Sequence, residues 1–84
     1  MRTVHKFPFY SIGSQMLLAL PAGHKVVLVA DQGGILHMWV DLDPAMPRQN
    51  EEFVVVGTGG EVPLSATHVG SAIVGMFVWH IYKL

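Results

Sequence analysis

Residues 25–42 read KVVLVADQGGILHMWVDL, and this stretch decides the fold. Two apolar runs, Lys25–Ala30 and Ile35–Leu42, flank the short segment Asp31-Gln32-Gly33-Gly34. β-Branched and aromatic runs on both sides of a glycine-rich turn are typical of a β-hairpin. Alternate residues of the second run share a face, and both faces carry large apolar groups. We therefore expect the hairpin to be covered on both sides over part of its length.

Further strands are predicted before this hairpin. Arg2–Tyr10 alternates by period two and contains Pro8, which cannot donate to a ladder. An edge strand, or a strand that ends near Pro8, is therefore expected there. A turn is predicted over Ser11–Ser14 and a short strand over Gln15–Leu20. Pro21-Ala22-Gly23 then has the residues of a tight turn, because proline presets φ and glycine accepts a left-handed conformation.

The second half of the chain predicts more strands and one helical turn. Asp43–Asn50 is expected to be a loop, Phe53–Val56 a strand, Gly57–Pro63 a loop and Leu64–His68 a helical turn. Gly70–Val74 and Met76–Lys83 form a second predicted hairpin around Val74-Gly75. We expect a single domain, residues 1–84, that is all-β or β-dominated α+β. Its form would be a small antiparallel sandwich or barrel of about six or seven short strands.

Composition excludes several classes of protein. Of 84 residues, 51% are hydrophobic and 13% charged, the opposite of a disordered chain. That apolar content exceeds what one small core hides, so we expect a homo-oligomer, first of all a dimer, or an apolar surface that binds a partner. The net charge of −1 with no basic stripe argues against nucleic-acid binding, and the absence of cysteine excludes disulfides and thiolate zinc sites. The longest apolar run, Ala72–Trp79, is far shorter than the ~20 residues of a membrane-spanning helix, so no membrane association is expected.

Acidic residues concentrate in the middle of the sequence. They are Asp41, Asp43, Glu51, Glu52 and Glu61, with Arg48 the only base among them. The other bases lie outside this block. The pattern predicts an acidic end that binds a partner, and an ordinary solvated loop face is the alternative interpretation.

The segment VVVGTGG, residues 54–60, is the most suggestive ligand-binding motif. A strand followed by glycines begins many nucleotide-binding loops, which makes Gly57, Thr58, Gly59 and Gly60 a weak candidate site. Such loops bind phosphate because a helix N-terminus follows, whereas here Glu61 and Pro63 follow. Backbone turns are therefore the favoured interpretation of these glycines.

No catalytic residues, cofactor or metal site are predicted. The five histidines have no close helical spacing, although His5, His37 and His80 lie on predicted strands that could bring them together. Asp41 and Asp43 are explained as well by an Asp-Pro turn at a strand end as by paired catalytic carboxylates. No serine lies in a nucleophile elbow, and we expect no enzyme activity.

Several short motifs together resemble a family of short, uncharacterised proteins encoded by bacteriophages and prophages. They are Lys6-Phe7-Pro8, Leu20-Pro21-Ala22-Gly23, Met38-Trp39-Val40-Asp41, Gly57-Thr58-Gly59 and Phe77-Val78-Trp79-His80. Met38 stands where the family pattern has leucine, and the loop after the glycines is short. The resemblance implies a phage gene product that acts in the bacterial host cytoplasm, and it brings no catalytic residues with it.

These observations lead to a functional expectation. We expect a non-enzymatic binding protein that inhibits bacterial host defence, in the manner of an anti-CRISPR protein, by occupying a host protein or defence complex. The acidic end would provide the contact. One alternative is a virion structural or assembly accessory protein that oligomerises. Another is a sponge for a small nucleotide signal that uses the Gly57–Gly60 loop.

Overall fold

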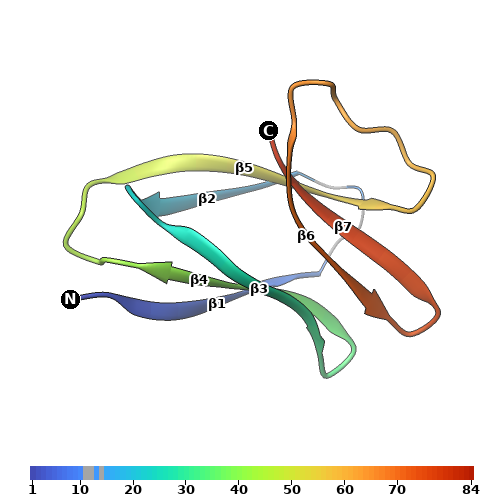
Figure 1. The fold of residues 1–84 in the computed structure, drawn as a ribbon, viewed down its shortest axis with the longest axis horizontal. Helices are drawn as coiled ribbons and strands as arrows, with labels where there is room; N and C mark the ends of the chain where they lie inside the picture. The colour runs from blue at the N-terminus through green and yellow to red at the C-terminus, as the bar shows by residue number, and fades with distance from the viewer. Residues whose placement is uncertain (11–12, 14) are drawn as a thin grey trace.

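β4 (Ile35–Leu42) is the central strand of a three-stranded antiparallel sheet in the computed structural model (Figure 1). It pairs with β1 (Thr3–Phe9) on one side and with β3 (Lys25–Gln32) on the other. The structure describes residues 1–10, 13 and 15–84. The turn expected over Ser11–Ser14 therefore lies, except for Gly13, outside the described residues. β1 is an edge strand, as Pro8 predicted.

A second antiparallel sheet contains four strands in the order β2-β5-β7-β6. These are β2 (Gln15–Pro21), β5 (Arg48–Gly57), β7 (Phe77–Lys83) and β6 (Thr67–Val74). The described residues form these seven strands and no helix, which confirms the predicted all-β fold class. None of the described residues belongs to a helix long and apolar enough to cross a membrane.

The core lies between the two sheets and follows the alternation of each strand. β4 contributes four fully buried residues, Leu36, Met38, Val40 and Leu42, from one face. Phe9 of β1 lies beside them in the same sheet, and across from them lie Phe53 and Val55 of β5, Ile81 of β7 and Leu20 of β2. Full burial of such a side chain contributes about 1.5–3 kcal/mol, so this layer is the main stabilising contact between the sheets.

The other face of β4 is also partly buried. His37 is only 8% exposed, and its ring centroid lies 5.7 Å from that of Trp39. His37 Nδ1 lies 2.7 Å from the carbonyl oxygen of Ile35, and a carbonyl only accepts, so Nδ1 is the protonated nitrogen that donates. A buried polar group needs such a partner, and this contact explains how a histidine is accommodated there.

The turn between β3 and β4 is shorter than the sequence indicated. β3 continues through Gln32, so the turn consists of Gly33 and Gly34 alone. Their φ angles are 64° and 82°, the pair of positive values that a type I′ hairpin requires and that glycine adopts without strain. The side chain of Asp31 completes the turn, because its Oδ1 accepts a 2.8 Å hydrogen bond from Gly34 N.

Two expected boundaries in the second half were wrong. β5 begins at Arg48 rather than Phe53, because Arg48, Gln49 and Asn50 pair with the end of β2. The helical turn expected over Leu64–His68 is a single hydrogen-bonded turn, in which Ala66 N donates to the carbonyl oxygen of Pro63 at 3.0 Å. β6 follows at once from Thr67, three residues earlier than predicted from Gly70, because Thr67 and His68 pair with Lys83 and Tyr82 of β7.

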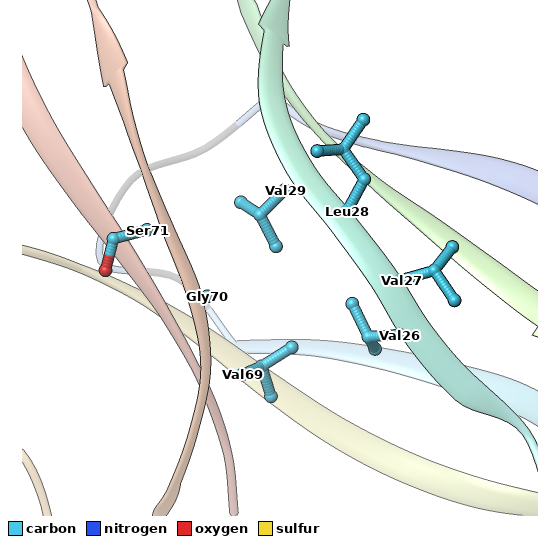
Figure 2. A pocket seen from close by; sticks show the side chains of 7 residues that line it. All are labelled: Val26, Val27, Leu28, Val29, Val69, Gly70 and Ser71. Atoms are coloured by element: carbon cyan, nitrogen blue, oxygen red, sulfur yellow. The ribbon is translucent and has the colours of Figure 1, made fainter.

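The two sheets also meet along the edges of β3 and β6, where Figure 2 shows the residues that line the gap between them. Each strand carries a bulge there, between Val26 and Leu28 in β3 and between His68 and Gly70 in β6. Bulges on edge strands prevent continuous backbone pairing with another strand. β3 and β6 therefore contact each other through side chains rather than through a hydrogen-bonded ladder. The packing is tightest at Gly70, where a Cβ atom would lie 2.5 Å from Val29 Cγ2.

Candidate functional site

The outer face of the second sheet brings together polar residues that are far apart in sequence. β7 lies between β5 and β6, and its Ile81 points into the core, so His80 and Tyr82 point outward. The register places Ser71 opposite His80 and His68 opposite Tyr82 on β6. Three residues that belong to no common sequence motif, His68, Ser71 and His80, therefore share one surface.

These side chains form a continuous chain of hydrogen-bonding contacts. His68 Nε2 lies 2.9 Å from Ser71 Oγ, and Ser71 Oγ lies 2.6 Å from His80 Nδ1. The other ring nitrogen of His80, Nε2, lies 3.0 Å from Thr58 Oγ1. The ring of His68 also packs edge-on against Tyr82, with centroids 5.2 Å apart. Each imidazole thus has a second contact that restrains its orientation.

The Gly57–Gly60 loop, predicted as a weak ligand site, lies next to this chain. Gly57, Thr58, Gly59 and Gly60 border a hollow of about 170 Å³ together with His80 and Tyr82. Gly59 has a φ of 90°, and Gly60 N donates to the carbonyl oxygen of Gly57 at 2.9 Å. This is a tight turn between strands, and no helix follows it among the described residues. The hollow is smaller than the roughly 300–1,000 Å³ of ordinary small-molecule sites.

Gly57 has a packing role as well. The six-membered ring of Trp79 lies across it, and a Cβ atom on Gly57 would be 2.8 Å from Trp79 Cζ3. Trp79 is also stacked on Phe77, with centroids 5.5 Å apart and an angle of 28° between the rings. The glycine therefore allows the aromatic pair to lie flat at the end of the sheet.

The tip of the β6–β7 hairpin is apolar and exposed, and Figure 1 shows it projecting at one end of the molecule. The exposed fractions are 68% for Ile73, 94% for Met76, 62% for Phe77 and 38% for Val78. Beside them lies an open hollow of about 450 Å³, lined also by Trp79, Gly57 and Thr58. We call Ile73, Met76, Phe77, Val78 and Trp79 the hairpin tip.

The hairpin tip has a defined backbone geometry. Its turn consists of Gly75 and Met76, and Gly75 has a φ of 60°. Glycine at the first central position is typical of a type II′ turn. β5 pairs with β7 only as far as Trp79, so no described strand covers the side of Phe77 and Val78 that faces away from β6. This is why large apolar side chains remain exposed there.

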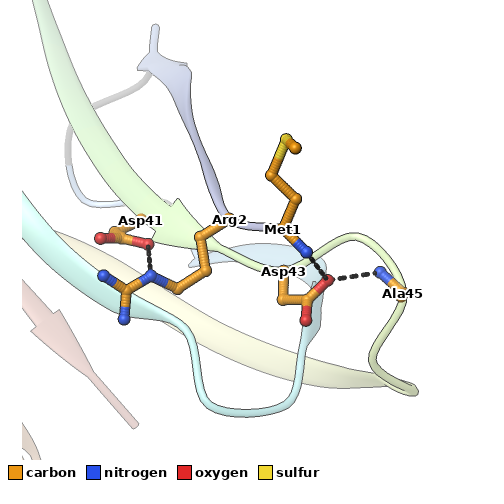
Figure 3. Close-up of polar contacts among 5 residues, drawn as sticks. All are labelled: Met1, Arg2, Asp41, Asp43 and Ala45. Atoms are coloured by element: carbon orange, nitrogen blue, oxygen red, sulfur yellow. Dashed lines mark hydrogen bonds and ion pairs between the residues drawn. The ribbon is translucent and has the colours of Figure 1, made fainter.

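The five predicted acidic residues are distributed over the end of β4, strand β5 and the loop before β6. Asp41 and Asp43 lie at the end of β4, where Asp41 Oδ1 is 3.3 Å from Arg2 Nε and Asp43 Oδ1 is 4.0 Å from the N-terminal amine (Figure 3). Glu51 of β5 pairs with Lys83 Nζ at 3.0 Å. Three of the five carboxylates are therefore balanced by a cation nearby.

The remaining acidic residues have no ion pair among the described residues. Glu52 is exposed on β5, and Glu61 is exposed in the loop before β6. The hydrogen bond from Lys83 also holds the pKa of the Glu51 carboxyl below its usual value, which favours its charged form. The charge available to a partner thus rests chiefly on Glu52 and Glu61.

Comparisons with curated proteins and with solved structures found no match to this chain. A match to a domain family covers residues 1–84, the whole sequence. The description of that family assigns it no function, so the geometry above is the basis for any functional proposal. The chain belongs to the family described as domain of unknown function DUF7352.

Proposed function

We propose that this protein is a non-enzymatic binding protein whose hairpin tip docks on another protein. The observation that carries the proposal is the group of exposed apolar side chains Met76, Phe77 and Val78, which line one open hollow. Clustered apolar surface on a small soluble domain marks interaction sites, and aromatic and methionine side chains are enriched in interface cores. The stacked Phe77–Trp79 pair supplies a rigid anchor of that kind.

The partner that we favour is a bacterial host protein, in keeping with the resemblance to phage-encoded proteins. An inhibitor of host defence, such as an anti-CRISPR protein, fits a small domain that acts by covering a surface. Exposed charge would assist by long-range attraction, which affects the rate of association more than the affinity. Glu52 lies beside Leu84, at the end of β7 opposite the hairpin tip, and Glu61 lies in the loop before β6. A virion accessory protein that associates with itself through the hairpin tip is the second possibility, and the same apolar surface supports it.

The test is a comparison of two surface variants with the wild-type protein. M76S/F77S removes the apolar groups of the tip, and both side chains are largely exposed, so the fold is expected to persist. L64S is the matched control, because Leu64 is fully exposed in the loop before β6 and outside the hairpin tip. Circular dichroism establishes that each variant is folded.

Binding is then measured by affinity capture from a bacterial lysate that carries defence systems, and self-association by light scattering. Loss of a central aromatic anchor typically costs about 2 kcal/mol or more, so M76S/F77S should weaken binding by roughly 30-fold or more. L64S should bind as the wild type does. Equal capture by all three proteins, with equal oligomeric state, would refute a role for the hairpin tip. A concentration-dependent oligomer lost only in M76S/F77S would instead support the self-association alternative.

A further inference from the structure

The polar chain on the outer face has a geometry that the proposed function does not use. Two imidazole nitrogens from neighbouring strands, His68 Nε2 and His80 Nδ1, converge on a single point, the oxygen of Ser71. Zinc binds imidazole nitrogen at about 2.0–2.1 Å. His68 Nε2 lies 2.9 Å and His80 Nδ1 lies 2.6 Å from Ser71 Oγ. These distances are only about 0.8 and 0.5 Å longer than a bond between zinc and an imidazole nitrogen.

The contacts around His80 favour metal binding through Nδ1. When His80 donates its Nε2 proton to Thr58 Oγ1, at 3.0 Å, Nδ1 keeps its lone pair and accepts from Ser71. The hydroxyl of Thr58 then has an acceptor in the carbonyl oxygen of Val78, 3.5 Å away. A histidine that ligates a metal commonly donates its other ring N–H to such a partner, which fixes the tautomer and the ring orientation.

His68 is restrained by ring packing. Its ring packs edge-on against Tyr82, and its centroid lies 6.5 Å from that of His80. Since Ser71 donates its one proton to His80, His68 Nε2 donates to Ser71 Oγ, and this proton moves to Nδ1 when an ion binds. Both histidines lie on strands of one sheet, so the spacing between their backbones is set by the β6–β7 register. A site held on rigid strands loses little conformational freedom when an ion binds.

We propose that His68 Nε2 and His80 Nδ1 bind a late first-row divalent cation such as Zn²⁺ between them, beside the Ser71 hydroxyl. Imidazole suits Zn²⁺, Ni²⁺ and Cu²⁺ better than Mg²⁺ or Ca²⁺, which prefer oxygen. No group of three or more His, Asp or Glu among residues 1–10, 13 and 15–84 is placed to hold a metal. The ion therefore takes two protein nitrogens, with Ser71 Oγ and water completing its coordination, and it exchanges readily.

The experiment is isothermal titration of the full chain with ZnCl₂, with His68→Gln and His80→Gln as test variants. His5→Gln is the matched control, because His5 is exposed on β1 in the other sheet. We expect one saturable site in the wild type and in His5→Gln, and loss of that site in both test variants. Thr58→Val should bind about tenfold more weakly, in line with the loss of a partner that orients a ligand.

A gain-of-binding variant makes the result independent of losses caused by misfolding. S71H places a third imidazole at the point of convergence and should bind Zn²⁺ at least tenfold more tightly than the wild type. Thermal unfolding with and without ZnCl₂ gives a second readout, since an ion that binds the folded state raises Tm. Equal Zn²⁺ affinity in the wild type and in His68→Gln would overturn the proposal, as would the absence of saturable binding in the wild type.

Discussion

Gly70 is the position where a single added methyl group should do most damage to this fold. A Cβ atom there would lie 2.5 Å from Val29 Cγ2 and 2.9 Å from Val29 Cβ. Rotation about χ1 of Val29 can move Cγ2 away, but it cannot move Cβ, which is attached to the backbone of β3. Gly70→Ala therefore has to push β3 and β6 apart at the edge where the two sheets touch.

The expected cost follows from two opposing effects. Overpacking of a well-packed contact costs about 1–3 kcal/mol, and the fixed position of Val29 Cβ places Gly70→Ala near the upper end. Replacing glycine within a strand returns about 0.5–1 kcal/mol through the lower entropy of the unfolded chain. The net loss is about 2 kcal/mol, which lowers Tm by about 8–16 °C in a domain of this size.

Urea unfolding of Gly70→Ala, Val29→Ala and the double variant measures this contact. Val29→Ala alone should cost roughly 1 kcal/mol, for two half-buried methyl groups. Val29→Ala removes the 2.5 Å contact with Cγ2 but keeps the 2.9 Å contact with Cβ. The double variant should therefore lose less than the sum of the two single losses, while part of the Gly70→Ala loss remains. Val27→Ala is the control partner, since Val27 is 49% exposed on the β3 bulge and should show no coupling. A loss below about 0.5 kcal/mol for Gly70→Ala, or strict additivity with Val29→Ala, would refute the tight contact between the sheets.

Two further predictions concern residues around β7 and β5. Gly57→Ala should displace the Trp79 ring, whose Cζ3 is 2.8 Å from the new Cβ. In a Trp39→Phe background, tryptophan emission should shift to longer wavelength with a stability loss of about 1 kcal/mol, and an unchanged spectrum would contradict the contact. For Glu51, the hydrogen bond from Lys83 lowers the carboxyl pKa from its usual 4.5 in the folded state. Its contribution to stability is therefore present above pH 4.5 and is lost as pH falls through the lower folded-state value. Glu51→Gln should cost less than about 1 kcal/mol at pH 7 and should reduce the acid-induced loss of stability in urea titrations. An identical pH dependence in the wild type and in Glu51→Gln would contradict this assignment.

The strand content of this protein is predictable from local pattern. Alternation in residues 35–42 identifies β4 and separates its two faces, because side chains on a strand point to opposite sides with a period of two. Both faces are apolar, so the sequence did not show that Leu36, Met38, Val40 and Leu42 form the core face. Pro8 marks β1 as an edge strand because proline cannot donate to a ladder. One error, the start of β5, arose where local signals misled. Gln49 and Asn50 are polar yet lie in β5, since pairing with β2 overrides their low strand propensity.

The positions of the candidate site residues depend on the register between β6 and β7. A shift of the β6–β7 turn by one residue changes every pairing between these two strands. A turn at Val74-Gly75, as the sequence suggested, would place Ser71 opposite Val78. The actual turn at Gly75 and Met76 places Ser71 opposite His80. The bulge between His68 and Gly70 then brings His68 opposite Tyr82, and no local pattern predicts that shift. The convergence of His68 and His80 was therefore beyond prediction from spacing alone.

The sequence by itself determined that this chain is a small all-β domain with more apolar surface than its core can bury. That follows from composition and period-two alternation, which are local properties. Only the tertiary structure decided which apolar residues remain exposed, because β5 ends at Gly57 and leaves Phe77 and Val78 of β7 without a neighbour on that side. It also decided which histidines meet and which carboxylates are neutralised, because these depend on contacts between residues distant in sequence.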